Sequence, residues 1–562
     1  MATINFKGRS FVQNHHLAVD FHALKIDKSK SLTPSPGLND NLIIQGDNLL
    51  ALKSLLPTHS GRIKCIYIDP PYNTGNEGWV YNDAVKSPII SDWIGQVVGK
   101  DEDDLTRHDK WLCMMMPRLK LLHELQAEDG VIFVSIDDNE ASSLKSLMDE
   151  IWGQSNFVAQ ICVQLNPRGR SMDKYLAKTH EYLLTYVKDS SRADAIRQIA
   201  KSAKQMAEYK FDDEKGKYRK LELRNRNPVF NRSNRPNLFY PFFVNPEDNS
   251  VSLLKSLTHS IEVLPLNSVG TEGCWTWGRA KAEKEIGLLV AGATAEGKWR
   301  IFRKDYAEKD GDEATTKAKA IWLEPEFNNE VGKEVLGELF GDAVFDFPKS
   351  PYLVKRCIEL GTSSDDECIV LDSFAGSGTT GHAVLQLNAE DGGNRKFILI
   401  EMEEYANRTT AERVRRVIEG VPNSKRPELQ DGFGGSFSYY ELGGAIESSR
   451  LLEGKTLPSY EELAGYVFYT ATGTQIDESL IDAKSMFIGE TSKYVSYMFY
   501  EPSVDYLKST ALTLEKARKL RSDSKTDKQL LIFAPAKYVD QTELDSLRIT
   551  FCQLPFEIYK VK

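Results

Sequence analysis

The tetrapeptide Asp69-Pro70-Pro71-Tyr72 follows the apolar run 63–68 and could make an aromatic amine nucleophilic. The exocyclic nitrogen of adenine or cytosine shares its lone pair with the ring. If the Asp69 carboxylate and the Pro70 carbonyl accepted its two N–H groups, that lone pair would be freed. The prolines fix the direction of both acceptors, and the Tyr72 ring offers a face for a flipped-out base. The alternative is a Pro-rich turn after a buried strand, which Asp-Pro commonly makes.

A glycine-rich segment downstream has the strand–loop–helix order of a cofactor site. Residues 368–372 read as a buried strand, and residues 373–380 lead through glycines into a helix. In doubly wound α/β folds such glycines let a ligand approach the backbone where a strand ends. A second strand, 397–401, then ends in Glu401, where a carboxylate usually holds ribose hydroxyls. The alternative for Glu401 is a solvated acid at a strand end.

The glycine segment lacks the residues of a phosphate-binding loop. Gly378-Thr379-Thr380 has no lysine, and the Gly-Lys-Thr at 454–456 has Ser449 where the first loop glycine should stand. A nucleotide-hydrolysing or helicase activity is therefore not expected. S-adenosylmethionine fits better, because it carries a ribose and an amino-acid tail but no phosphate.

The Asp-Pro-Pro-Tyr motif followed by a Phe-Ala-Gly-Ser-Gly motif resembles the β-class amino-methyltransferases of DNA. A larger set of motifs, over roughly residues 40–445, is similar to the modification subunits of type III restriction-modification systems. The residues that carry the resemblance, besides the two motifs, are 46–48, 73–75, 131–140, 235–241, 275–277, 346–351, Glu401 and 412–418. The resemblance implies a doubly wound, mostly parallel α/β sheet of the Rossmann-like methyltransferase type. The order of apolar and polar segments adds an inserted target-recognition domain and a small α/β C-terminal domain to this fold.

The resemblance also assigns roles by position. The catalytic residues would be Asp69, Pro70, Pro71 and Tyr72, with the amine held by Asp69 and the Pro70 carbonyl and the base stacked on Tyr72. Asp47 would contact the adenine end of the cofactor, and Glu401 its ribose. The methionine end would be lined by Phe374, Gly376 and Gly378. Lys349 and Ser350 would belong to an element that closes over the cofactor, and the remaining cofactor-binding residues would be Asp372 and Thr379. Asp47 could equally be a helix N-cap. Ser373 stands where many relatives carry a second phenylalanine, which could loosen cofactor packing.

Composition bounds the remaining choices. The chain has 562 residues, a net charge of −10 and seven cysteines without a Cys-x-x-Cys pair. These cysteines read as reduced thiols of a cytoplasmic protein. No histidine spacing indicates a metal site, the acidic run 101–104 reads as a solvated loop, and no apolar run reaches membrane-spanning length.

A basic stretch between residues 215 and 235 is the candidate DNA contact. It carries Lys215, Lys217, Arg219, Lys220, Arg224, Arg226, Arg232 and Arg235. Asparagines are interleaved, and asparagine and arginine are the usual readers of adenine and guanine edges. The alternative is a solvated, partly disordered loop. Phosphate contacts need only one basic face, so the acidic overall charge does not exclude double-stranded DNA.

The chain divides into five predicted segments. Residues 1–40 read as an N-terminal arm, and residues 41–190 alternate strands and helices as the catalytic half. Residues 191–340 break that rhythm and would recognise the target, while 341–430 would be the cofactor-binding half. Residues 431–562 would be an assembly domain, which would contain an amphipathic helix over 507–520 and strands at 530–533 and 549–551. Trp275, Trp277, Trp299 and Trp322 are expected in cores rather than as stacking platforms.

These patterns predict a site-specific DNA methyltransferase that acts on the N6 amine of adenine. Under the resemblance the chain would be a homodimer and would work with a restriction subunit. Cytosine-N4 methylation uses the same chemistry and stays open, as does an RNA acceptor. A third alternative is a DNA-recognition scaffold of a defence complex with little turnover of its own.

Overall fold

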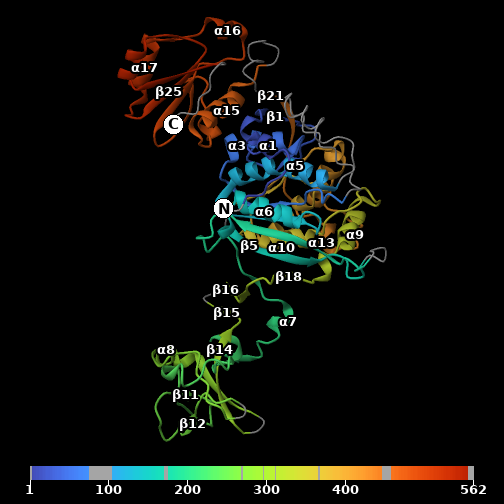
Figure 1. Ribbon diagram of the computed structural model, residues 1–562, viewed down its shortest axis with the longest axis vertical. Helices are drawn as coiled ribbons and strands as arrows, with labels where there is room; N and C mark the ends of the chain where they lie inside the picture. The colour runs from blue at the N-terminus through green and yellow to red at the C-terminus, as the bar shows by residue number, and fades with distance from the viewer. Residues whose placement is uncertain are drawn as a thin grey trace. The chain divides into compact units, whose positions relative to one another are not determined.

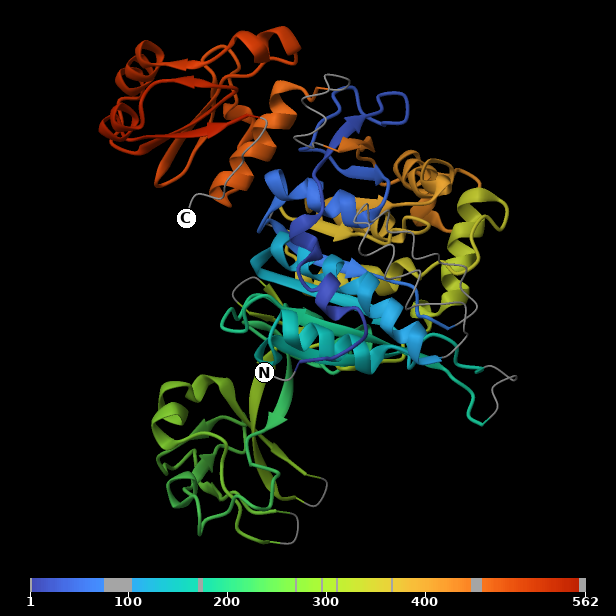
Figure 2. The same ribbon diagram turned by 45° about the horizontal axis from the view of Figure 1, so that its top comes forward.

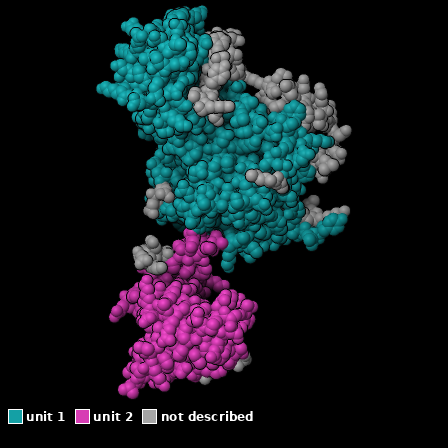
Figure 3. Space-filling view, turned by 60° about the vertical axis from the view of Figure 1, so that its left-hand side comes forward, with its two compact units in different colours: residues 1–197, 319–562 teal, residues 198–318 magenta. Residues whose placement is uncertain are grey.

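The structure is a computed structural model that describes residues 3–74, 104–169, 175–267, 270–294, 297–309, 312–364, 367–445 and 457–554. It contains two compact units (Figure 3). Unit 1 comprises residues 1–197 and 319–562, and unit 2 comprises residues 198–318. Among the described residues no helix is long and apolar enough to cross a membrane. All seven cysteines are free thiols.

Unit 1 is built on a ten-stranded sheet with the order β1-β21-β2-β20-β19-β3-β4-β6-β5-β18 (Figures 1 and 2). In that order the strands are β1 (His22–Ile26), β21 (Ser438–Ala445), β2 (Leu42–Gln45), β20 (Lys396–Glu401), β19 (Ile369–Asp372), β3 (Ile63–Ile68), β4 (Gln126–Ile136), β6 (His180–Val187), β5 (Phe157–Gln164) and β18 (Ile321–Trp322). The six from β21 to β4 run parallel. Strand β6 is antiparallel to β4 and β5, and β1 to β21. The predicted doubly wound, mostly parallel sheet is confirmed.

Helices cover both faces of this sheet. Helices α3 (Asn48–His59), α5 (Asp104–Leu125) and α6 (Ala141–Ile151) share one hydrophobic core with Ile66 and Ile68 of β3. Helix α10 (Pro351–Gly361) lies on the other face, where Gly361 packs against Cys65. It contacts α11 (Thr379–Asp391), which contacts α12 (Glu412–Glu419). Every residue of β3 is buried, as a central parallel strand requires.

Unit 2 contains small antiparallel sheets. Strands β13 (Leu289–Ala293), β14 (Trp299–Tyr306), β9 (Gly216–Glu222) and β8 (Phe211–Asp213) form one, and β11 (Val251–Ser252), β10 (Phe242–Val244) and β12 (Ile261–Val263) form another. Trp275 and Trp277 are buried in their shared core, and Trp299 packs partly against it. Trp322 is buried in unit 1. These indoles therefore serve packing.

The N-terminal segment and the inserted segment differ from the predicted ones. The N-terminal 40 residues are no free arm, since α1 (Arg9–Val12) and α2 (His15–Ala18) contact α5, and β1 extends the sheet. The compact inserted unit is 198–318 rather than 191–340. Residues 319–340 return to unit 1, because Trp322 pairs beside Val163 in the sheet and α9 (Asn329–Phe340) packs against α12.

The C-terminal segment also begins later than predicted, because β21 belongs to the main sheet. Helix α15 (Tyr460–Thr472) contacts α3, and a second sheet has the order β22 (Phe487–Glu490), β23 (Tyr494–Met498), β25 (Gln529–Ala534) and β27 (Ile549–Gln553). The single helix predicted over 507–520 is wrong. The structure has α16 (Val504–Ser509) and α17 (Leu514–Ser524), separated by the short strand β24 (Leu512–Thr513), and Thr513 caps the second helix.

Candidate active site

Four neighbouring parallel strands carry the predicted acids at their carboxyl ends. In the order β2-β20-β19-β3, Asp47 follows β2, Glu401 ends β20, Asp372 ends β19 and Asp69 follows β3. From β3 the chain continues to β4 on one side, and from β19 to β20 on the other. This reversal of strand order is where ligands bind in open α/β sheets.

The glycine loop is held by the two central acids. The Asp372 carboxylate accepts the Phe374 N–H at 3.0 Å, and the Glu401 carboxylate accepts the Gly376 N–H at 2.7 Å. Gly376 and Gly378 have φ of 50° and 81°, the left-handed region that glycine tolerates. The loop then enters α11 at Thr379. The expected strand, loop and helix are therefore all present, and Glu401 positions the loop backbone.

Burial perturbs both of these acids. Desolvation raises the pKa of Asp372 to about 7, although the Thr380 hydroxyl and the Phe374 N–H oppose it. Desolvation likewise raises the pKa of Glu401 to about 7, against hydrogen bonds from the N–H groups of Glu403 and Gly376. Two carboxyl groups that change charge near neutral pH thus flank one loop, which is characteristic of functional sites.

Arg413 of α12 lies beneath the loop and had no role assigned to it from the sequence. Its guanidinium is fully buried and donates to the Ser377 hydroxyl at 2.8 Å and the Thr379 hydroxyl at 2.7 Å. Burial lowers the pKa of Arg413 to about 9. The Thr379 hydroxyl is therefore hydrogen-bonded to Arg413 and is not a free group of the loop.

Asp47 acts as the helix cap that the sequence allowed. Its carboxylate accepts the Leu49 N–H at 2.8 Å at the start of α3, and the Arg118 guanidinium lies 3.4 Å away. The next residue, Asn48, donates to the Ser373 carbonyl at 2.9 Å. The Asp47 segment and the glycine loop are thus connected across the sheet edge.

The Asp69–Tyr72 segment is fixed by neighbouring side chains. The Tyr72 hydroxyl lies 2.8 Å from Asp69 Oδ1, and the Trp111 indole donates to the Pro71 carbonyl at 2.6 Å. Pro70 is buried, and Asp69 keeps 25% of its side chain exposed. A carboxylate that is held in place yet reachable suits the predicted role as an amine acceptor.

Two further side chains complete this cluster. Lys349 was expected among the cofactor ligands, but the structure places its ammonium 2.6 Å from the Tyr72 hydroxyl and 3.4 Å from Asp69 Oδ1. Glu181 of β6 accepts from Lys349 through both oxygens, at 2.7 and 2.6 Å. Sequence reasoning missed Glu181, because it reads as an ordinary polar residue just before the apolar run 182–187. Ser350 caps α10 and donates to the Glu326 carbonyl.

The residues just beyond Tyr72 are anchored below the site. Asn73 has φ of 61° and donates to the buried Glu140 carboxylate, which also contacts His108 at 2.6 Å. Residues 101–103 of the acidic run, Gly75 of the resemblance and the Gly-Lys-Thr at 454–456 with Ser449 lie outside the described residues, while Asp104, the last acid of the run, begins α5. In the part of the chain that the structure describes, no cluster of three or more His, Cys, Asp or Glu could hold a metal.

The predicted DNA contacts all lie in unit 2, and they fall into two groups. Lys215, Lys217, Arg226, Arg232 and Arg235 are exposed, whereas Arg219, Lys220 and Arg224 are partly buried. Arg219 is engaged within the unit, with Asp305 at 2.7 Å and Glu208 at 2.5 Å. In the exposed group, Arg226 pairs with Glu222 at 3.2 Å and Arg232 with Glu272 at 2.9 Å, yet these two side chains remain 78% and 58% exposed.

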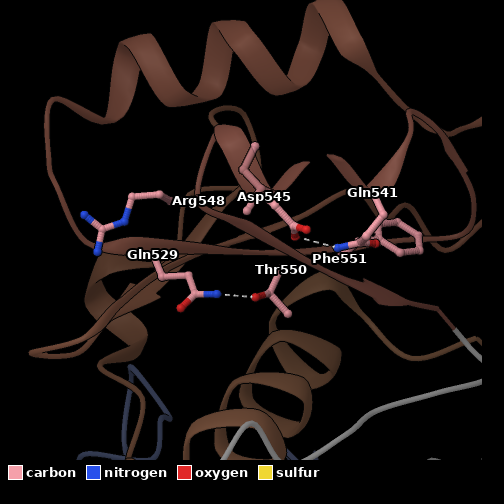
Figure 4. A pocket seen from close by; sticks show the side chains of 7 residues that line it. Gln529, Gln541, Asp545, Arg548, Thr550 and Phe551 are labelled. Atoms are coloured by element: carbon pink, nitrogen blue, oxygen red, sulfur yellow. Dashed lines mark hydrogen bonds between the residues drawn. The ribbon is translucent and has the colours of Figure 1, made fainter. Parts of the chain in front are cut away.

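A pocket in the C-terminal sheet contains none of the predicted site residues (Figure 4). Its lining includes Gln529 and Thr550, which hydrogen-bond at 2.5 Å, and Gln541 and Asp545, which do so at 2.9 Å. These polar side chains are therefore hydrogen-bonded in pairs within the pocket. The candidate active site is therefore the cluster at the carboxyl ends of the main sheet.

A family model described as "DNA methylase" matches residues 63–412, which include both motif segments and the inserted unit. The chain belongs to this DNA methylase family. The methylase chain is 34% identical over 423 residues to the type III restriction-modification enzyme EcoPI Mod subunit of Escherichia phage P1, covering 72% of this chain and 64% of that protein. It is 33% identical over 392 residues to the type II methyltransferase M.KpnI of Klebsiella pneumoniae, covering 69% and 86%.

The methylase also aligns with solved structures. A crystal structure of an M1.HpyAVI–SAM complex is 14% identical, covers 66% of this chain and 98% of that one, and gives a TM-score of 0.30. The fold assignment rests on the sheet itself. The methylase spans about two thirds of the length of the EcoPI Mod subunit and about half that of the StyLTI Mod subunit of Salmonella typhimurium.

Proposed function

We propose that this methylase transfers a methyl group from S-adenosylmethionine to the N6 amine of a flipped adenine in double-stranded DNA. One observation carries the proposal: the acceptor motif at Asp69 and the glycine loop after Asp372 follow adjacent strands β3 and β19. A methyl donor at one strand end would then lie beside a methyl acceptor at the next. Family membership supports the same chemistry.

The residues at the donor side fit S-adenosylmethionine. The loop backbone approaches the Phe345 ring closely, since a Cβ on Gly376 would come within 3.3 Å of it. The buried Ser373 hydroxyl has no partner, and the carboxylates of Glu401 and Asp47 can accept from ribose and adenine donors. The partly buried Phe374 ring would pack against the methionine end. When bound, the cofactor supplies an activated methyl group.

On the acceptor side the chain supplies position and charge. The Asp69 carboxylate and the Pro70 carbonyl would each accept one N–H of the target amine and direct its lone pair toward the methyl group. The Tyr72 ring would stack on the base, with its hydroxyl already fixed beside Asp69 at 2.8 Å. Positioning of this kind can contribute about 7–11 kcal/mol to a two-reactant step.

Adenine is proposed rather than cytosine because the motif begins with Asp69, and Asp rather than Ser at this position favours adenine. The similarity to the EcoPI Mod subunit supports the further proposal that the methylase is the modification and recognition subunit of a type III-like restriction-modification system. We propose double-stranded DNA, a second copy of the chain and a restriction subunit as its partners. The cytoplasm is the proposed location. Unit 2, with its exposed basic residues, would read the target.

Transfer of labelled methyl groups from S-adenosylmethionine to unmethylated bacterial DNA tests this function. Wild-type chain is expected to label DNA, and Asp69→Ala is expected to bind both DNA and cofactor without labelling. Asp138→Ala is a matched control, because this carboxylate lies beyond the neighbouring strand β4 and contacts Tyr182 instead. Specific DNA binding without transfer, even with a restriction subunit present, would instead favour a recognition scaffold.

A further inference from the structure

We infer that Glu181 is a positioning residue of the acceptor site, which holds the Lys349 ammonium away from the Asp69 carboxylate. The inference rests on the proposed function. Glu181 lies on β6, two strands from β3, and Lys349 precedes Ser350, the N-cap of α10. The two residues are thus brought to the Asp-Pro-Pro-Tyr motif by elements distant in the sequence.

The distances show where the ammonium is held. Lys349 Nζ lies 2.7 and 2.6 Å from the two Glu181 oxygens and 2.6 Å from the Tyr72 hydroxyl, but 3.4 Å from Asp69 Oδ1. Three donors of the ammonium are therefore matched to Glu181 and Tyr72. The contact with Asp69 is longer than a hydrogen bond between charged groups should be.

Burial makes this arrangement matter. Glu181 is 3% exposed and Lys349 is 9% exposed, so water cannot screen either charge. If Glu181 were absent, the nearest carboxylate to the ammonium would be Asp69. An ammonium is a stronger donor than an aromatic amine, so Lys349 would then compete with the target base for its acceptor.

The charge balance of methyl transfer points the same way. As the N–C bond forms, the C–S bond breaks, its electron pair goes to sulfur, and the positive charge passes to nitrogen. That nitrogen then releases one proton to the Asp69 carboxylate. Two carboxylates and one ammonium leave the cluster with a net charge of −1, which favours positive charge on the nitrogen. Without the Glu181 charge the cluster would be neutral.

Tyr72 is oriented by the same arrangement. Its hydroxyl accepts from Lys349 and lies 2.7 Å from Glu181 Oε2 and 2.8 Å from Asp69 Oδ1. Burial and both carboxylates raise the pKa of Tyr72, so the hydroxyl keeps its proton for one of them. Glu181 therefore fixes the ring that would stack on the base as well as the cation beside it.

The backbone that carries Glu181 is rigid. Strand β6 is paired on both sides, with β4 and with β5, where Glu181 lies opposite Val163. Lys349 is fixed by the Ser350 cap and by Pro351 at the first turn of α10. Each partner thus holds the other at a set place rather than on a mobile loop.

The test measures single-turnover methylation by the full chain with saturating S-adenosylmethionine and unmethylated bacterial DNA. Glu181→Gln is expected to be about 30-fold slower, the loss typical of removing one partner of a buried charge pair. The dissociation constants for DNA and cofactor should stay within about twofold, because the variant leaves the glycine loop and the basic residues of unit 2 unchanged, and misplacement of the base at Asp69 shows in the rate. Asp129→Asn, which removes the separate Lys64–Asp129 ion pair of the same sheet, should leave the rate unchanged.

The decisive comparison adds Lys349→Met. If Glu181 acts through Lys349, the double variant Glu181→Gln/Lys349→Met should be no slower than Lys349→Met alone. A double variant that is slower by the full effect of Glu181→Gln overturns the inference, as does a wild-type rate for Glu181→Gln. If Glu181→Gln does not fold, the double variant, which buries no unpaired charge, still allows the comparison. A wild-type chain without methyl transfer overturns both the inference and the proposed function.

Discussion

Replacing Gly378 with alanine should weaken cofactor binding strongly. Its φ of 81° costs an L-residue about 1–2 kcal/mol. A Cβ there would lie 2.8 Å from the Thr410 carbonyl oxygen. Either the glycine loop or the helical turn Asn407–Ala411, which precedes α12, must therefore move. Overpacking of that kind adds about 1–3 kcal/mol. If the cofactor must restore the original loop, a total of about 3 kcal/mol lowers its affinity roughly 100-fold.

Gly392 at the other end of α11 is the matched control. It has a similar φ of 71°, but a Cβ there would meet no atom within 4 Å. Gly392→Ala should therefore lose about 1–2 kcal/mol of stability and keep its cofactor affinity. Calorimetric titration with S-adenosylmethionine, beside thermal unfolding, measures both quantities. Equal affinities for Gly378→Ala and wild type would refute the assignment of this loop to the cofactor.

Three further predictions concern pH and salt. The pKa of Glu401 is raised to about 7, and its ionised form would accept the ribose hydroxyls, so the Kd for S-adenosylmethionine should rise as pH falls from 8 to 6; a flat Kd contradicts this role. Burial raises the pKa of Asp372 to about 7, so between pH 5.5 and 8 the folded chain loses a proton that the unfolded chain has already released. The free energy of unfolding should therefore fall by about 2 kcal/mol over this range, and denaturant unfolding of Asp372→Asn should lack that part of the loss. Replacing Arg226 and Arg235 with alanine should lower the slope of log K for DNA against log salt by about two, whereas Arg219→Ala, which breaks the Asp305 pair, should destabilise unit 2 and leave that slope unchanged.

Much of the fold and half of the site could be predicted from sequence, because both depend on strand ends. An apolar run such as 63–68 marks a buried strand, and a polar motif after it must lie at a sheet edge. The same logic placed Asp69, Asp372 and Glu401 correctly at strand ends. The structure adds that β3 and β19 are adjacent, so the strand ends that carry Asp69 and Asp372 are neighbours.

Glu181 and Arg413 could not be predicted in their roles, because neither belongs to a motif with a chemical reading. Glu181 is the second residue of β6, just before its apolar run, and a buried acid there signals a partner without naming it. Lys349 is 168 residues away in the sequence. The break at 510–513 escaped detection for a similar reason. It depends on Leu512 pairing with Lys537, a contact between distant residues.

The identity of the methylated nucleoside tests the central claim most directly. DNA labelled by the full chain and S-adenosylmethionine would be digested to nucleosides and separated, with Asp69→Ala run in parallel. The account predicts label in N6-methyladenosine with wild type and none with the variant. Label in N4-methylcytosine would keep the site and contradict the choice of base. Label that survives Asp69→Ala would contradict the site itself.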